Sequence, residues 1–164
     1  MTSIKIIPFV LLIMVHQIGI GQTSKNDSST ESIILFVCEH GAAKSTIAAA
    51  YFNKMAKEKN IMYKAIFRGT TPDTVLSPGA TQGLLNDGFD TQGWQPQRVT
   101  LNDINNAAAI ITFDCNVEVG EKTKNFLYRW NGLPPVSQDY QAARDQIIEQ
   151  ITLLIKELER RKQQ

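Results

Sequence analysis

Short apolar runs recur along this chain, separated by segments of mixed polarity. Residues 33–37 (IILFV) and 107–113 (AAAIITF) are continuous apolar runs. Such runs are typical of strands that are buried on both faces, as in a parallel sheet. Residues 62–67 predict another strand, and residues 126–130 predict a last one, which ends at the loop 131–135 (NGLPP).

Helical segments are predicted in the intervals between these strands. Residues 46–57 are rich in Ala, Lys and Met and contain no Gly or Pro, which favours a helix. Ser77 and Pro78 are typical of an N-cap and a first helical residue, and their helix should end near Gly88. Residues 99–106 predict a short helix. In the last helix, apolar residues recur on one face: Tyr140, Ala143, Ile147, Ile151, Leu154, Ile155 and Leu158.

This alternation of strands and helices predicts the fold class. We expect an α/β fold in three layers, with a central four-stranded, mostly parallel sheet and helices on both of its faces. In such sheets, ligands bind beyond the carboxyl ends of the strands. Because Cys38 directly follows the first predicted strand, we expect the functional site at that edge.

The first 22 residues differ in kind from the rest of the chain. Lys5 precedes a short apolar run, and small residues close the segment. A membrane anchor is the alternative, but a spanning helix needs about 20 apolar residues and this run is shorter. The pattern is typical of a secretory signal peptide. We therefore expect a signal peptide at residues 1–22, a polar linker at residues 23–31, and one domain at residues 32–164 that is periplasmic or secreted.

Composition narrows the function classes further. The net charge of +1 predicts neither nucleic acid nor, after signal cleavage, a membrane as a partner. The chain has 2 cysteines, Cys38 and Cys115, which are too few for a disulfide scaffold in a domain of this size. The absence of a C-x-x-C pair argues against a zinc site, and no cofactor is implied. A disulfide between Cys38 and Cys115 stays open, because exported compartments are oxidising.

The segment from Cys38 to Ser45 (CEHGAAKS) joins a predicted strand to a helix N-terminus. Backbone N–H groups curled at that point, together with the helix dipole, form a cradle for a tetrahedral anion and would stabilise a thiolate. A nucleotide-binding G-x-x-x-x-G-K-[ST] loop does not fit, because Cys38 and Ala43 stand where it needs glycine. A structural cysteine at a strand end is the bland alternative. It leaves Lys44 and Ser45 unexplained.

The stretch ILFVCEHGAAKSTIAAAYF resembles the start of the low-molecular-weight protein tyrosine phosphatase superfamily, which includes thioredoxin-coupled arsenate reductases. The family pattern is a strand, then C-x5-R-[ST], then a helix, and the resemblance runs from Ile33 to about Leu158. It implies that Cys38 is the nucleophile, which attacks phosphorus or arsenic and forms a covalent thiol adduct. It also implies that Ser45 hydrogen-bonds the thiolate. The implied oxyanion-binding residues are Glu39, His40, Gly41, Ala42, Ala43 and Lys44.

Lys44 stands where the family has arginine. An arginine binds two oxygens with a planar fork, whereas a lysine is a point charge. Lys44 could still neutralise the anion, but we expect it to orient the transition state less well. The alternative is an ordinary solvated lysine at a helix start. Arg68, at the end of a neighbouring predicted strand, could supply a guanidinium instead.

The loop 131–135 carries no carboxylate, although the family has an aspartate followed by proline there. That aspartate protonates the leaving oxygen, and such groups contribute about 10²–10⁴-fold in rate. Asp139 is the nearest carboxylate, but a helix-capping role is at least as plausible. We therefore expect weak activity on esters with poor leaving groups.

Cys115 lies close to where the arsenate reductases carry their second redox cysteine. It comes about one position later than the match requires, and the third cysteine is absent. Three interpretations stay open: a resolving thiol, a disulfide partner for Cys38, or a buried residue. His40 could help to hold the thiolate ionised, or it could be a plain polar loop residue.

Together, the resemblance implies a thiol-based enzyme acting on a phosphomonoester, such as phosphotyrosine, or on arsenate. One alternative is an arsenate reductase that uses Cys38, Cys115 and a thioredoxin-like reductant. Another is a non-catalytic oxyanion-binding protein, which Lys44 and the missing aspartate favour. The expected ligands are accordingly phosphate, arsenate or a phosphorylated substrate.

Overall fold

The computed structural model describes residues 31–120 and 126–161. The predicted signal peptide, residues 1–22, and all of the predicted linker except Glu31 lie outside the described residues. Within the described ranges, no helix is both long and apolar enough to span a membrane.

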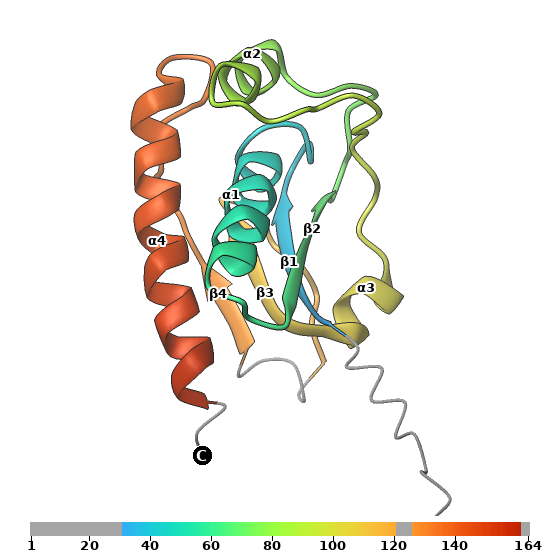
Figure 1. Ribbon diagram of the computed structural model, residues 1–164. Coiled ribbons are helices and arrows are strands. Elements are labelled where there is room, and N and C mark those ends of the chain that lie inside the picture. The colour runs from blue at the N-terminus through green and yellow to red at the C-terminus, as the bar shows by residue number, and fades with distance from the viewer. Residues whose placement is uncertain (1–30, 121–125, 162–164) are drawn as a thin grey trace, which may run out of the picture.

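All pairings in the central sheet are parallel. Its strands are β1 (Ser32–Cys38), β2 (Tyr63–Gly69), β3 (Ala107–Phe113) and β4 (Leu127–Arg129), in the spatial order β2-β1-β3-β4 (Figure 1). The predicted parallel α/β sheet is therefore confirmed. Cys38 pairs with Gly69 of β2 and with Phe113 of β3, so these three strands end at one edge of the sheet.

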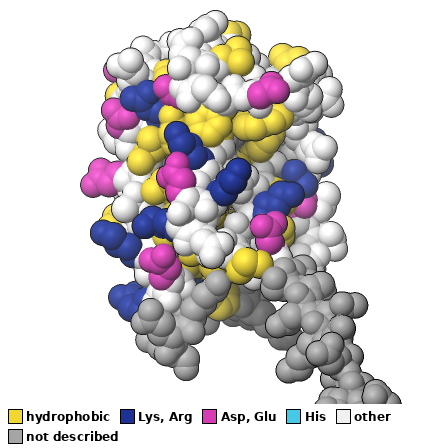
Figure 2. All heavy atoms as spheres, in the orientation of Figure 1, with side chains coloured by type: hydrophobic (Ala, Val, Ile, Leu, Met, Phe, Trp, Pro, Cys, Tyr) yellow, Lys and Arg dark blue, Asp and Glu magenta, His cyan; other side chains and the backbone are white. Residues whose placement is uncertain are grey.

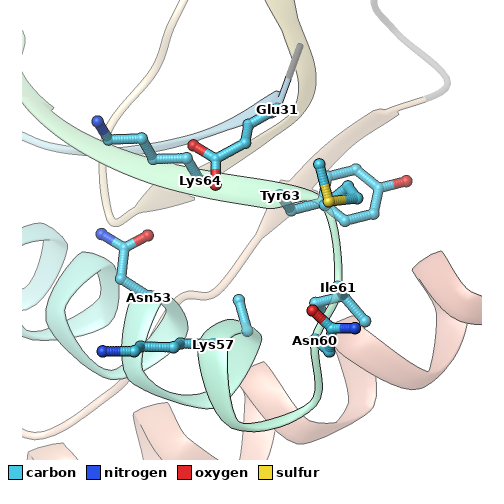
Figure 3. Close-up of a pocket in the computed structure, with 9 residues that line it drawn as sticks. Glu31, Asn53, Lys57, Asn60, Ile61, Tyr63 and Lys64 are labelled. Carbon is cyan, nitrogen blue, oxygen red and sulfur yellow. The ribbon is translucent and has the colours of Figure 1, made fainter. Parts of the chain in front are cut away.

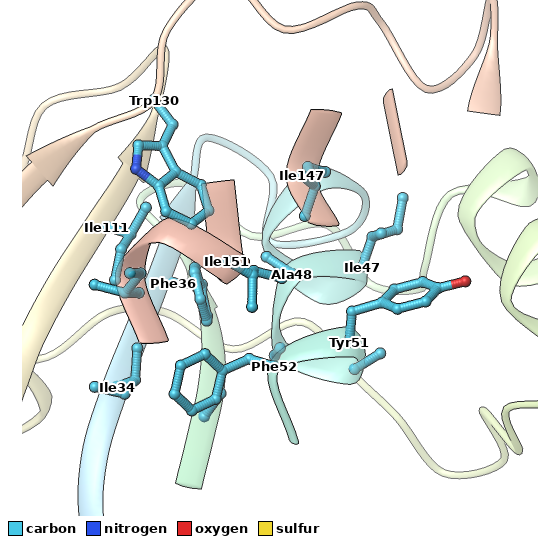
Figure 4. Packing of buried hydrophobic residues seen from close by; sticks show 14 of the residues in the cluster. Ile34, Phe36, Ile47, Ala48, Tyr51, Phe52, Ile111, Trp130, Ile147 and Ile151 are labelled. Carbon is cyan, nitrogen blue, oxygen red and sulfur yellow. The ribbon is translucent and has the colours of Figure 1, made fainter. Parts of the chain in front are cut away.

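Helices cover both faces of the sheet, as expected. The helices α1 (Lys44–Glu58) and α4 (Tyr140–Arg161) pack on one face, where Phe36, Phe52 and Ile151 are fully buried (Figure 4). On the other face, Ile104 of α3 (Leu101–Asn106) packs in a smaller cluster with Leu35 and Val37. Alternate residues of β1 thus serve opposite faces, which is why its sequence is continuously apolar.

Local capping fixes two helix starts. In α2 (Pro78–Asn86), the Ser77 side chain accepts a hydrogen bond from the N–H of Ala80, and Pro78 is the first helical residue, as predicted. The short helix α3 begins at Leu101, two residues later than expected, because Thr100 and Asp103 form a capping box. The residue before that cap is therefore outside the helix.

Side chains and a loop close the outer edge of β2. Asn53 donates to the carbonyl of Ala65 at 3.0 Å and accepts from its N–H at 2.7 Å, as a neighbouring strand would. The N–H of Gly69 donates to Gln97, and the carbonyl of Gly69 accepts from Val99. An edge that is paired in this way is a poor template for association with another strand.

Candidate active site

The carbonyl groups of the loop after β1 all point outward. Each carbonyl from residue 38 to residue 42 accepts one hydrogen bond from a donor outside the loop. In chain order, the donors are Thr70 N at 3.1 Å, Thr71 N at 2.8 Å, Asp73 N at 3.0 Å, Thr46 Oγ1 at 3.0 Å and Ser77 N at 2.9 Å. No described peptide bond is cis. In a trans peptide, the N–H points opposite to the preceding carbonyl. The N–H groups of residues 39–43 therefore face the inner side of the loop.

The sulfur of Cys38 lies on this inner side. The N–H of Gly41 donates to Cys38 Sγ at 3.2 Å, and Ser45 Oγ lies 3.1 Å from the same atom. Cys38 is 8% exposed and opens into a pocket of about 200 Å³, whose wall also includes Ala43 and Val136. Hydrogen-bond donors around a sulfur stabilise it when it carries negative charge. The Cys38 sulfur therefore lies beneath a small pocket, within reach of a backbone N–H and a hydroxyl group.

Two glycines let the loop pack closely against the end of β2. Gly41 has φ +62°, and a Cβ on it would lie 2.8 Å from the backbone nitrogen of Gly69. A Cβ on Gly69 would in turn lie 2.9 Å from the nitrogen of Gly41. Sequence reasoning identified Gly41 but missed Gly69, whose role depends on this contact between separate segments.

Lys44 forms a bridge between three parts of the site. Its Nζ donates to Asp114 Oδ2 and to the carbonyl of Leu133, both at 2.8 Å. The side chain is only 17% exposed. The alternative of a solvated helix-start lysine is therefore wrong. The positive charge that follows the loop is shared with a carboxylate, so it is only partly available to a bound anion.

Asp114 is a second site residue that sequence reasoning missed. It has a left-handed backbone with φ +51°, and its Oδ1 accepts from the N–H of Gly132 at 2.9 Å. The hydrogen bond from Lys44 is the largest cause that lowers the pKa of this carboxyl. A signal was present, because Asp114 directly follows the strand beside β1.

Arg68 and Asp139 have structural partners away from the nucleophile. The Nε and Nη2 atoms of Arg68 each lie 3.2 Å from an oxygen of Asp103 on the α3 side of the sheet. Asp139 Oδ1 accepts from the N–H of Ala142 at 2.9 Å, as an N-cap of α4 does. Neither residue lines the pocket at Cys38.

His40 lies at the rim of the same pocket, between carboxylates. Its Nδ1 is 3.2 Å from Asp73 Oδ1, and its Nε2 is 3.8 Å from Glu39 Oε2. The His40 side chain is 56% exposed. These contacts direct the ring toward the rim carboxylates.

Cys115 packs with the apolar cluster on the α3 face, whereas Cys38 belongs to the cluster on the α1 face. The Sγ of Cys115 lies 3.5 Å from the carbonyl oxygen of Val37. Burial raises the pKa of this thiol to about 11, so it is protonated at neutral pH. Both cysteines are free thiols in this structure.

A pocket larger than the one at Cys38 lies at the opposite end of the sheet. It has a volume of about 480 Å³ and is lined by Asn53, Lys57, Tyr63 and Lys64, among others (Figure 3). Its walls come from the start of β2 and the end of α1, and they contain no cysteine or histidine. On the surface in Figure 2, Lys and Arg side chains are interspersed with Asp and Glu. Chemistry, not pocket size, thus identifies the site at Cys38.

Comparisons with known proteins agree with this architecture. The family model described as low molecular weight phosphotyrosine protein phosphatase matches residues 33–124. No curated protein matches the chain in sequence. The fold is similar to that of YfkJ from Bacillus subtilis, with a TM-score of 0.70 and 19% identity over 79% of this chain and 96% of that one.

Two arsenate reductases are also similar in structure. The thioredoxin-dependent arsenate reductase of Corynebacterium glutamicum has a TM-score of 0.66 and 21% identity, over 80% of this chain and 64% of that one. The arsenate reductase of Archaeoglobus fulgidus has a TM-score of 0.61 and 27% identity, over 75% of this chain and 98% of that one.

Proposed function

The chain belongs to the low molecular weight phosphotyrosine protein phosphatase family, and from this premise we propose that it hydrolyses aryl phosphomonoesters with Cys38 as the nucleophile. The observation that carries the proposal is the loop whose carbonyls are all bound on its outer side, with the Cys38 sulfur on its inner side. Inward N–H groups match the oxygens of a phosphoryl group, and they act in addition to the N-terminus of α1.

The first chemical step moves the phosphoryl group to sulfur. The Cys38 thiolate attacks phosphorus, an S–P bond forms, and the ester P–O bond breaks with its electron pair on the leaving oxygen. During this step, the oxyanion is held by backbone N–H groups of the loop, those of Glu39, His40, Gly41, Ala42 and Ala43. In the second step, the Ser45 hydroxyl donates a hydrogen bond to the Cys38 sulfur as the S–P bond breaks.

Apolar side chains near the opening support aryl esters as the substrate class. Val136 lines the pocket. Leu133 is buried in the loop where the family would supply an aspartate. Without that acid, the leaving group must depart as a stable anion. A phenolate does so far more readily than an alkoxide, because its conjugate acid has a pKa of about 10. Phosphotyrosine and synthetic aryl phosphates meet this requirement.

Steady-state assays with p-nitrophenyl phosphate test the proposal on the full chain. We expect Cys38→Ser to abolish turnover, because the hydroxyl is a far weaker nucleophile than the thiolate. Cys115→Ser is the matched control and should retain activity, since its thiol packs on the other face of the sheet. Binding of inorganic phosphate without any turnover in the wild type would contradict the enzyme and favour an oxyanion-binding protein.

Arsenate reduction is the second candidate function. The likeness to the Archaeoglobus fulgidus arsenate reductase favours it, and reduction needs no acid for an organic leaving group. The protonated, half-buried thiol of Cys115 argues against a rapid relay between the cysteines. Thioredoxin-dependent release of arsenite that is lost in Cys115→Ser would establish the reductase.

We also propose that the chain is exported, to a periplasm or to the medium. The support is the N-terminal pattern of one lysine, a short apolar run and small residues, which lies outside the described residues. Cell fractionation with mass spectrometry of the mature chain tests this, and we expect an N-terminus near residue 22. Recovery of the full-length chain from the cytoplasm would contradict it.

A further inference from the structure

Asp114 lies at the same sheet edge as the nucleophile. It follows Phe113, the residue of β3 that pairs with Cys38, and parallel strands place their following residues side by side. Its side chain is 44% exposed and lines the pocket into which Cys38 opens. No residue of the loop 131–135 carries a carboxyl group. Asp114 instead supplies a carboxylate to this pocket from the end of β3.

The carboxylate of Asp114 is fixed in position and ionised. Lys44 holds Oδ2, and the N–H of Gly132 holds Oδ1. The hydrogen bond from Lys44 lowers the pKa of the carboxyl. A carboxyl group that is ionised at neutral pH can accept a proton there, but it has none to donate.

Glu39 is the other carboxylate that lines the pocket, and it is held less firmly. Its side chain is 67% exposed, and its Oε2 lies 3.8 Å from Nε2 of His40. Catalysis by proton transfer needs a group that is held in the right geometry. Asp114 meets that requirement, because three of its polar atoms are bound by Lys44, Gly132 and Asn131.

We infer that Asp114 is the general base that activates water in the second half of the reaction, an inference that rests on the proposed phosphatase function. In that step, the water oxygen attacks phosphorus and the S–P bond breaks with its electron pair on Cys38 Sγ. The water proton passes to a free lone pair of the Asp114 carboxylate, and inorganic phosphate leaves. The first half has no acid, so Asp114 acts only after the aryl group has departed.

Pre-steady-state kinetics of the full chain with p-nitrophenyl phosphate separate the two halves. For Asp114→Asn we expect the initial burst of nitrophenolate to persist, while the steady-state rate falls by about 10²-fold or more. The phosphorylated Cys38 should accumulate and be visible by mass spectrometry after acid quenching. Asp90→Asn is the matched control, since Asp90 does not line the pocket and its Oδ1 accepts a local bond from the N–H of Gln92, so the ratio of burst to steady-state rate should be unchanged.

The outcomes distinguish this inference from the proposed function. If the burst and the steady-state rate fall in equal proportion in Asp114→Asn, the residue only supports the fold of the site and the inference is wrong. An unchanged steady-state rate overturns it as well. If the wild type shows no Cys38-dependent turnover of p-nitrophenyl phosphate, the phosphatase proposal itself fails.

A second variant tests the ionisation of the base. Lys44→Met removes the partner that lowers the pKa of Asp114, so the acid limb of the pH profile for the second step should shift to higher pH. An unshifted limb would contradict the inference. The other titratable or charged groups that share a pocket with Asp114 are Cys38, Glu39 and His40 in the loop, Cys115 after β3, and Arg129 of β4.

Discussion

Gly41 shows how one residue sets the shape of the loop. Its positive φ and its contact with Gly69 are separate constraints. For Gly41→Ala we therefore expect a loss of turnover and a decrease of about 2 kcal/mol or more in unfolding free energy, since the left-handed region alone costs about 1–2 kcal/mol. Urea denaturation and p-nitrophenyl phosphate assays measure the two effects.

Gly93→Ala provides the control for that substitution. Gly93 also has a positive φ of +78°, but a Cβ there would meet no atom within 4 Å. We expect only the backbone cost and normal turnover. Equal effects of the two substitutions on turnover would show that the contact between Gly41 and Gly69 has no functional role.

The thiol of Cys115 should react slowly in the folded chain. Its pKa of about 11 means that only about one molecule in 10⁴ carries the thiolate at pH 7, because each unit is tenfold. In the Cys38→Ser variant, we expect alkylation by iodoacetamide, followed by mass spectrometry, to be slow at pH 7 and to accelerate in denaturant. Rapid alkylation of the folded variant would revive the resolving-thiol interpretation.

At the scale of elements, the edge of β2 makes a stability prediction. Asn53→Ala removes two hydrogen bonds to Ala65 and leaves part-buried backbone groups unpaired. We expect a loss of about 1–3 kcal/mol in unfolding free energy and a greater tendency to associate. Denaturation and light scattering measure these effects.

Asn86→Ala is the comparison for the edge variant. Asn86 accepts one exposed hydrogen bond from Gln82 within α2, and such pairs are worth about 0.2–0.5 kcal/mol. If both asparagine variants lose equally little stability, the side-chain pairing at β2 does not protect the sheet edge.

The elements themselves were predictable because their signals are local. The apolar run before Cys38 became β1, and Ser77 with Pro78 began α2 as expected. The contacts within the site were not predictable in this way. Lys44 and Asp114 are 70 positions apart, so their ion pair depends on the strand order β1-β3 and on a left-handed turn after β3. A motif search sees the lysine only as a departure from arginine.

At the scale of the whole molecule, Asp87 joins three helices. Its carboxylate, just after α2, accepts from Tyr51 of α1 at 2.7 Å and from Tyr140 of α4 at 2.6 Å, and it contacts Arg144 at 3.1 Å. Burial opposes ionisation, but the hydrogen bonds from Tyr140, Tyr51 and Arg144 outweigh it and lower the pKa of Asp87. Burial and, to a smaller extent, the hydrogen bond to Asp87 raise the pKa of Tyr51 to about 12.

This cluster predicts how stability depends on pH. A carboxyl group with a lowered folded pKa stabilises the fold above its unfolded value of 3.8, and this contribution is lost as pH falls through the folded pKa. Asp103 and Glu157 also have lowered pKa values, so their contributions have the same sign. We therefore expect the Tm, followed by circular dichroism, to be nearly constant between about pH 5 and pH 8 and to fall steeply in more acidic solution.

Asp87→Asn tests the origin of that fall. The amide cannot replace the charge that Arg144 and the tyrosines bind, so the Tm at pH 7 should decrease, and the acid decline should become shallower because one titrating group is gone. Asp90→Asn changes a neighbouring aspartate whose Oδ1 accepts only a local bond from the N–H of Gln92, and its profile should follow the wild type. An Asp87→Asn profile parallel to that of the wild type would mean that the carboxylate joins the helices through its shape and not through its charge.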